Sequence, residues 1–277
     1  MAGASSESLS AALADLETTL PTASLSLARE LFGILAVLDG SAGLRRALTD
    51  PSREGAEKSA LVHSLLDGKA SGDAVEITAK LAASRWADAR DISDALETIA
   101  STVASAVAEQ GAGTASGLSG LEKLQNDLFA FNNTVEGSHE LQAALTDQQA
   151  SPEARRTLAL RLVPGASEEA RLLIGQAVSS PRGAKPTALV EKFASLAAAR
   201  QKRWIADVAV ARPLSQAQLT RLQDGLNTLY GRELKINTTV EPSLVGGLRV
   251  TVGDEVLDAS TVTRLGELRR QLAAQAR

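Results

Sequence analysis

Four carboxylates close to paired glycines form the most conspicuous group of potentially reactive side chains in this 277-residue chain. Glu241, Asp254, Glu255 and Asp258 lie in the stretch VEPSLVGGLRVTVGDEVLDAS, residues 240 to 260. Mg²⁺ accepts carboxylate ligands, and glycine lets a backbone approach a phosphate closely, so a magnesium-dependent enzyme is one hypothesis. Alternate residues of a strand point to opposite faces, however, so the four acids need not converge. Turn acids that hydrogen-bond to the local backbone are the favoured interpretation.

The other candidates for chemistry are weaker. The chain has no cysteine, which excludes disulfides, thiolate nucleophiles and zinc sites that need sulfur. His63 lies in an apolar helical pattern and His139 in a loop-like stretch, each without a second ligand or an acid–base partner. The run GAGTASG lacks a preceding strand and misplaces the third glycine of a dinucleotide-binding loop. The sequence therefore predicts no catalytic residue, no metal site and no cofactor.

The composition favours packed helices over a ligand pocket. Hydrophobic residues make up 44% of the chain but aromatic residues only 3%, so the apolar surface is mostly Ala, Leu and Val. No run approaches the roughly 20 apolar residues that span a bilayer. The opening MAGASSESLS lacks the basic and apolar regions of a signal peptide, so we expect a cytoplasmic protein.

Charge is distributed unevenly along the chain. Residues 1 to 199 hold 17 basic and 25 acidic side chains, a balance of −8, whereas residues 200 to 277 hold 12 and 8, a balance of +4. The basic end intersperses its cations with acids and has Trp204 and Tyr230 as its only aromatic residues, so it offers no stacking platform for nucleic acid. An acidic protein partner is at least as good an interpretation.

Helical periodicity dominates the first 200 residues. Leucines recur at helical spacing from Leu9 to Leu20 and apolar residues do so from Leu27 to Leu38. Residues 44 to 68 break at Asp50-Pro51 and resume as a helix, and the helical pattern then continues from Lys80 to Gln110. These patterns predict helical bundles.

A long-period repeat organises these helices. LRRALTD at residues 44 to 50 returns as LQAALTD at residues 141 to 147, and the sequences that follow match weakly in the same order. We interpret the repeat as two related helical modules, residues 1 to 110 and 121 to 199, with GAGTASGLSG at residues 111 to 120 as a flexible joint. A chance match between Ala- and Leu-rich helices is the alternative.

The last 78 residues, from 200 to 277, change to a mixed pattern. WIADVAVARP, ELKINTTVEP and GLRVTVGDEVLD alternate like strands. Between the first two lies a helix with Ser215 and Gln218 spaced as a capping box and Gly231 at its end. A final helix places Leu265, Leu268 and Leu272 on one face. We expect a mainly α protein: duplicated helical bundles followed by a small β-α-β-β-α domain.

The stretch VAVARPLSQAQLTRLQDGLNTLYGRELKINTTVEPSLVGGLRVTVGDEVLDASTVTRLGELRRQL resembles the C-terminal region of the δ subunit of bacterial F-type ATP synthase, a family that includes mitochondrial OSCP. Three features carry the resemblance. They are the run ARPL, the Leu-rich helix that follows it, and after that helix the order PSLVGG, strand, GDxVxD and helix. The extra helical module is similar to the long form of δ in actinobacteria. The resemblance implies a structural signature made of Glu241, Pro242, Gly246, Gly247, Gly253, Asp254, Asp258 and Ser260.

The resemblance also implies a function without chemistry. Family members are stator subunits that hold N-terminal segments of the α subunits of F1 and join them to the b subunit of the peripheral stalk, at the cytoplasmic face of the membrane. We expect a helical module to bind the α segment and the basic C-terminal domain to bind b, but which module binds α stays open. The alternative is a helical adaptor or regulator unrelated to ATP synthase.

Overall fold

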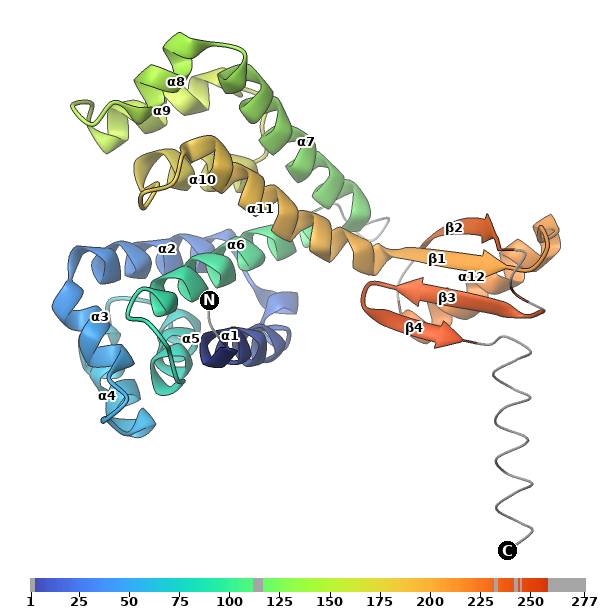
Figure 1. Ribbon diagram of the computed structural model, residues 1–277, viewed down its shortest axis with the longest axis horizontal. Helices are drawn as coiled ribbons and strands as arrows, with labels where there is room; N and C mark the ends of the chain where they lie inside the picture. Colours follow the sequence, from blue (N-terminus) through green and yellow to red (C-terminus); the bar gives the residue numbers. More distant parts are fainter. Residues whose placement is uncertain (1–2, 112–116, 232–233, 242–243, 245, 259–277) are drawn as a thin grey trace, which may run out of the picture. The chain divides into compact units, whose positions relative to one another are not determined.

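The computed structural model describes residues 3–111, 117–231, 234–241, 244 and 246–258, which divide between two compact units. Among the described residues, the first unit is helical and comprises residues 3–111 and 119–197; the second comprises residues 117–118 and those from 198 to 258 and contains the sheet (Figure 1). No helix within the described ranges is both long enough and apolar enough to cross a bilayer. Each unit is described by itself below.

The helical unit begins with six α-helices and a short 3₁₀ turn. They are α1 (Gly3–Leu16), η1 (Leu20–Thr22), α2 (Leu25–Gly40), α3 (Ala42–Thr49), α4 (Gly55–Leu66), α5 (Gly72–Ala83) and α6 (Asp91–Gly111). The leucine patterns predicted α1 and α2. The continuous helix expected from Lys80 to Gln110 is wrong, because residues 84–90 form a loop between the end of α5 and the start of α6. There the Trp86 Nε1–H donates to the Leu81 carbonyl over 2.7 Å and turns the chain back.

Five further helices follow: α7 (Gly117–Glu136), α8 (His139–Thr146), α9 (Pro152–Leu162), α10 (Glu168–Ser179) and α11 (Pro186–Gln201). His139, expected in a loop, is instead the first residue of α8, because Ser138 caps that helix. Of the predicted joint at residues 111–120, residues 112–116 lie outside the described ranges, while Gly111 ends α6 and Gly117 begins α7.

The same helix caps recur at an offset of 96 or 97 residues. The Ser41 side chain accepts from the Leu44 N–H and that of Ser138 from the Leu141 N–H; Ser71 and Ser167 likewise accept from Ala74 and Ala170. Such side-chain caps fix where each helix starts. We therefore propose that α2 to α6 and α7 to α11 are two copies of one five-helix repeat. On this alignment α1 has no counterpart.

Both repeats share one hydrophobic core, and α6 is its centre. Almost all of α6 from Asp91 to Ala106 is buried, and α10 contacts both α6 and α2 (Figure 1). The rings of Phe32 on α2 and Phe193 on α11 lie 6.4 Å apart at a 58° tilt, within the range of favourable aromatic pairs. The two repeats therefore pack as one body.

A buried ionic cluster links the repeats at the same interface. Arg182, in the loop between α10 and α11, places Nε 2.7 Å from Asp39 Oδ2, Nη2 2.8 Å from Asp94 Oδ1 and Nη1 3.3 Å from Glu97 Oε1. Glu97 also accepts from Lys192 Nζ over 2.7 Å. The cluster thus joins the end of α2 and the start of α6 to the α10–α11 loop and α11.

The environment of Arg182 shows how strongly the cluster holds it. Its side chain is 8% exposed, and burial alone would lower its pKa, but Glu97, Asp39 and Asp94 outweigh this effect, so the pKa is raised. Its backbone has φ of 53°, a left-handed conformation that residues other than Gly, Asn and Asp rarely adopt. The carboxylates therefore hold Arg182 in a backbone conformation that an arginine by itself disfavours.

We expect Arg182→Met to lower the free energy of unfolding by about 3 kcal/mol, because it removes the cation beside the partly buried Asp39 and Asp94 and leaves the buried Glu97 carboxylate with Lys192 as its cation. Methionine keeps most of the side-chain volume and the same backbone strain. Arg29→Met is the matched control, since Arg29 and Glu168 form an exposed inter-repeat pair at 3.7 Å, worth about 1 kcal/mol or less. Urea unfolding measures both variants. Equal losses would contradict the role given to the buried cluster.

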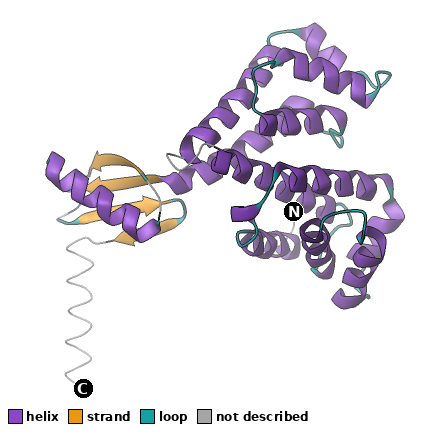
Figure 2. Cartoon of the chain, turned by 180° about the vertical axis from the view of Figure 1, so that it is seen from behind, coloured by secondary structure: helices purple, strands orange, loops and turns teal. Residues whose placement is uncertain are grey.

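The second unit is a small mixed sheet with one helix. Its elements are η2 (Lys202–Trp204), β1 (Ile205–Val210), α12 (Gln216–Tyr230), β2 (Lys235–Val240), β3 (Leu248–Val252) and β4 (Glu255–Asp258). The strand order is β2-β1-β3-β4; β1 and β2 are parallel and the other pairs antiparallel. Figure 2 shows α12 across one face of the sheet. Val208, Val250 and Leu226 are among the buried residues between the two layers.

The sequence predicted this unit closely. The capping box of Ser215 and Gln218 is present, and Gly231 ends α12 in the left-handed conformation with φ of 64°. The three predicted strands lie where the alternating patterns placed them, but the sheet has a fourth strand, β4, which the predicted β-α-β-β-α order did not include, because four residues after the turn are too few to show an alternating pattern. The predicted last helix, with Leu265, Leu268 and Leu272, lies outside the described residues.

Candidate partner-binding groove

The acids and glycines that the sequence singled out belong to a hairpin. Val252 pairs with Glu255, so Gly253 and Asp254 form a two-residue turn between β3 and β4. Gly253 has φ of 60°, as the first position of such a tight turn requires. Asp254 and Glu255 are exposed. The expected structural turn is therefore present.

The structure separates the carboxylates that a metal site would need together. Glu241 follows β2 and its N–H donates to the Val210 carbonyl over 2.9 Å, beside the start of β3, whereas Asp254 and Glu255 follow the end of that strand. Because β3 has five residues, its two ends lie about 17 Å apart. Among the described residues, no group of three or more His, Asp or Glu side chains is placed to hold a metal ion.

The remaining signature positions are only partly described. Gly246 is half-buried, and Gly247 has φ of 84°, a conformation that favours glycine. Pro242 and Ser260 lie outside the described residues, and Asp258 is the last residue of β4. The candidate site lies elsewhere, in the helical unit.

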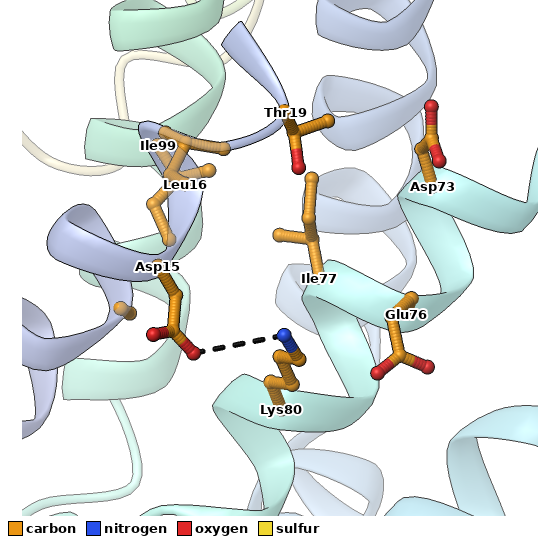
Figure 3. Close-up of a pocket in the computed structure, with 9 residues that line it drawn as sticks. Asp15, Leu16, Thr19, Asp73, Glu76, Ile77, Lys80 and Ile99 are labelled. Atoms are coloured by element: carbon orange, nitrogen blue, oxygen red, sulfur yellow. Dashed lines mark ion pairs between the residues drawn. The ribbon is translucent and has the colours of Figure 1, made fainter.

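A groove between α1 and α5 is the candidate site (Figure 3). It holds about 440 Å³ of empty space, open side included. Its floor is apolar and its rim carries charge. The floor comes from Ala12, Leu16, Ile77 and Ile99, and the rim from Asp15, Thr19, Asp73, Glu76 and Lys80.

The groove exists because α1 is fixed against the loop before α6. The Ser5 hydroxyl donates to Asp91 Oδ2 over 2.6 Å and accepts from the Ala87 N–H over 2.8 Å, and Ser5 itself is fully buried. Farther along, the Gln110 side chain donates to the Leu20 carbonyl and holds the end of the α1 segment. Polar anchors at both ends therefore set the position of α1 relative to α5 and α6.

The rim is acidic. Lys80 Nζ lies 3.6 Å from Asp15 Oδ2, and both side chains are more than half exposed, so this pair adds little stability (Figure 3). Asp73 and Glu76 on α5 stand on the same rim. A ligand that places apolar side chains on the floor and cations along the edge would complement this surface.

The second repeat does not reproduce the groove in the described residues. α10 is the counterpart of α5, but no counterpart of α1 lies against it; it contacts α6 and α2 instead. Sequence reasoning missed the groove: the leucine stripe of α1 showed that this helix packs, but not that α5 would be its neighbour.

We expect Ser5→Ala to lower the free energy of unfolding by about 1–3 kcal/mol, because it leaves the Ala87 N–H without its acceptor and removes the shorter of two hydrogen bonds to Asp91 Oδ2, so that the one from the Asp88 N–H stays. Ser64→Ala is the control, since the Ser64 hydroxyl donates to the Leu61 carbonyl at an exposed position. Urea unfolding compares the two. A loss no larger than that of the control would show that Ser5 does not fix α1.

Comparison with known proteins identifies the family. The family model described as "ATP synthase delta (OSCP) subunit" matches residues 99–272. The ATP synthase subunit delta of Pseudarthrobacter chlorophenolicus is 66% identical over 274 residues, covering 99% of this chain and 100% of that protein. The subunit delta of Streptomyces avermitilis is 38% identical, covering 98% of each.

A chain in the cryo-EM structure of the Toxoplasma gondii mitochondrial ATP synthase hexamer also matches, with 20% identity, a TM-score of 0.35, and coverage of 62% of this chain and 97% of that one. The full-length sequence relatives do not favour an adaptor unrelated to ATP synthase. The chain belongs to the ATP synthase δ (OSCP) family, the stator subunits of the peripheral stalk.

Proposed function

We propose that this stator subunit holds the N-terminal segment of an α subunit of F1 in the α1–α5 groove and the b subunit on its second unit. The observation that carries the proposal is the groove itself: an apolar floor between two helices with an acidic rim. The link would keep the F1 head from turning with the rotor, so that proton-driven rotation is coupled to ATP synthesis. The subunit would act without catalysing a reaction, at the cytoplasmic face of the membrane.

An amphipathic helix is the ligand that best fits such a groove. A groove lined by two helices can accept a third helix that inserts its apolar residues at i, i+3 and i+4. Burying two or three large side chains on Leu16, Ile77 and Ile99 would contribute roughly 1.5–3 kcal/mol each. Asp73 and Glu76 favour Lys or Arg on the flank of that helix. We therefore assign the α segment to the first repeat.

The second unit offers a different kind of surface for b. Residues 200–277 carry a net charge of +4, which suits an acidic partner. Beside the C-terminal end of α12, Leu229 is 64% exposed and Leu257 41% exposed, around a hollow also lined by Tyr230 and Val252. Arg203, Asp254 and Glu255 also line the hollow, and an exposed apolar patch rimmed by charged residues is typical of protein interfaces.

We expect Ile77→Asp to weaken binding of a peptide that copies the N-terminal segment of the cognate α subunit by tenfold or more, since it puts a charge on the apolar floor. Ile77 is half-buried, so the fold should tolerate the change. Val37→Asp is the control, because Val37 is 55% exposed on α2 and does not line the groove. Calorimetric titration of the full chain measures both; unchanged affinity for Ile77→Asp would overturn the assignment.

We expect deletion of residues 202–277 to abolish binding of the b subunit and to preserve binding of the α peptide. The cut leaves α11 complete and removes the sheet. Titration of the truncated chain with the soluble part of b, and separately with the α peptide, tests the assignment. Retained b binding would place the b site in the helical unit instead.

A further inference from the structure

The face of the sheet that carries α12 is left open at β4. Val250 on β3 is buried in the core of the second unit, and it pairs with Leu257 on β4. Directly paired residues point to the same side of a sheet, so Leu257 lies on the α12 side as well. Leu257 is nevertheless 41% exposed, and Leu229 near the end of α12 is 64% exposed. On this face, α12 therefore covers β3 and leaves β4 uncovered.

The hollow beside the end of α12 occupies this uncovered part. It holds about 1110 Å³ of empty space, open side included. Tyr230 and Val252 contribute to its apolar floor, and its edge carries Asp254 and Glu255 against one cation, Arg203. Helices pack at about 8–10 Å from one another, so a second helix beside α12 would lie over this hollow. Its ligand should be apolar on one side and basic along the flank.

The chain itself supplies such a ligand directly after β4. Residues 259–277 contain Leu265, Leu268 and Leu272, which helical spacing places on one face. The same residues contain four arginines and one glutamate, a balance of +3, opposite in sign to the edge of the hollow. Both the apolar pattern and the charge of this segment therefore complement the hollow.

The segment also starts where it can reach the hollow. β4 runs from the β3–β4 turn to Asp258, so a chain that turns back after Asp258 runs along β4 toward the acidic edge. Four strand residues span about 13 Å, a length that an α-helix covers in about nine residues. A helix that starts near position 261 would bring Leu265 and Leu268 over the hollow and Arg269 to the acidic edge.

We propose that residues 259–277 fold back as an amphipathic helix beside α12 and cover this hollow in the free subunit. Leu265 and Leu268 pack against the exposed leucines of the hollow, and Arg269 lies beside the two acids of the turn. Because the helix is tethered to β4, it meets the hollow at a high effective concentration, which an outside ligand would have to exceed.

The consequence for the b subunit rests on the proposed function, whereas the covering of the hollow does not. Residues 200–277 carry a balance of +4, of which residues 259–277 contribute +3. Successive residues of a helix are rotated by about 100°, so with Leu265 and Leu268 turned inward, Arg270 and Arg277 lie on the outer side. The leucines of the hollow then bind this chain's own helix, and the cationic outer face of that helix meets the acidic partner.

Hydrogen–deuterium exchange of the free, full-length chain tests the covering helix. Residues 261–272 should exchange roughly tenfold or more slowly than the same residues in a synthetic peptide of residues 259–277, since an isolated helix of this length is marginal in water. Equal exchange in the chain and the peptide would overturn the proposal. Protection that falls on tenfold dilution of the chain would also overturn it, because a second copy would then make the contact.

Two neighbouring residues of β4 locate the contact. Leu257→Asp puts a charge on the covered face and should abolish the protection. Val256→Asp is the matched control and should keep it, because Val256 is 59% exposed and points to the opposite face of the sheet. Leu268→Asp should abolish the protection without altering the sheet, and unchanged exchange of β1 and β3 checks the fold. Retained protection in Leu257→Asp or Leu268→Asp would overturn the proposal.

A further variant separates the covering helix from the contact with b. Arg270→Glu should keep the protection of residues 261–272 and weaken calorimetric binding of the soluble part of b by about fivefold, through charge reversal on the outer face. Unchanged affinity for b in a chain that keeps the protection would refute the contact with b and support the covering helix alone. Loss of the protection in Arg270→Glu would contradict the placement of this residue on the outer side.

Discussion

The ion pairs between Arg182 and three carboxylates are the constraint on which the helical unit depends. They lie where the end of α2, the start of α6 and the α10–α11 loop meet, so they fix the second repeat against the first. An ionic contact of this kind is directional, whereas the surrounding Ala and Leu packing is not. A subunit that must transmit torque needs its parts held at a defined angle. The cluster fixes the angle between the two repeats at the centre of the unit.

The duplication that we propose accounts for both the similarity and the difference between the two repeats. The first repeat keeps an extra helix, α1, which the buried Ser5–Asp91 hydrogen bond holds beside α5 to make a groove. The second repeat has no such helix in the described part of the chain and uses α10 and α11 to pack on the first. The first copy therefore forms the α1–α5 groove, and the second packs on the first through α10 and α11.

Local signals in the sequence predicted the elements well and their partners poorly. The capping box of α12, the glycine turn at Gly253 and the alternating strands were predictable because each depends on neighbouring residues. The loop before α6, where Trp86 bonds back to α5, was missed because helix-forming residues surround it. Arg182 and Ser5 gave no signal, since their partners lie 85 to 143 residues away and only folding brings them together.

The most direct test of the account is hydrogen–deuterium exchange of the full chain with and without the peptide copying the α-subunit N-terminal segment. Peptide binding should slow exchange in α1 and in α5, residues 72–83, and leave α10, residues 168–179, unchanged. Protection centred on α8 to α10 instead would contradict the assignment of the receptor to the first repeat.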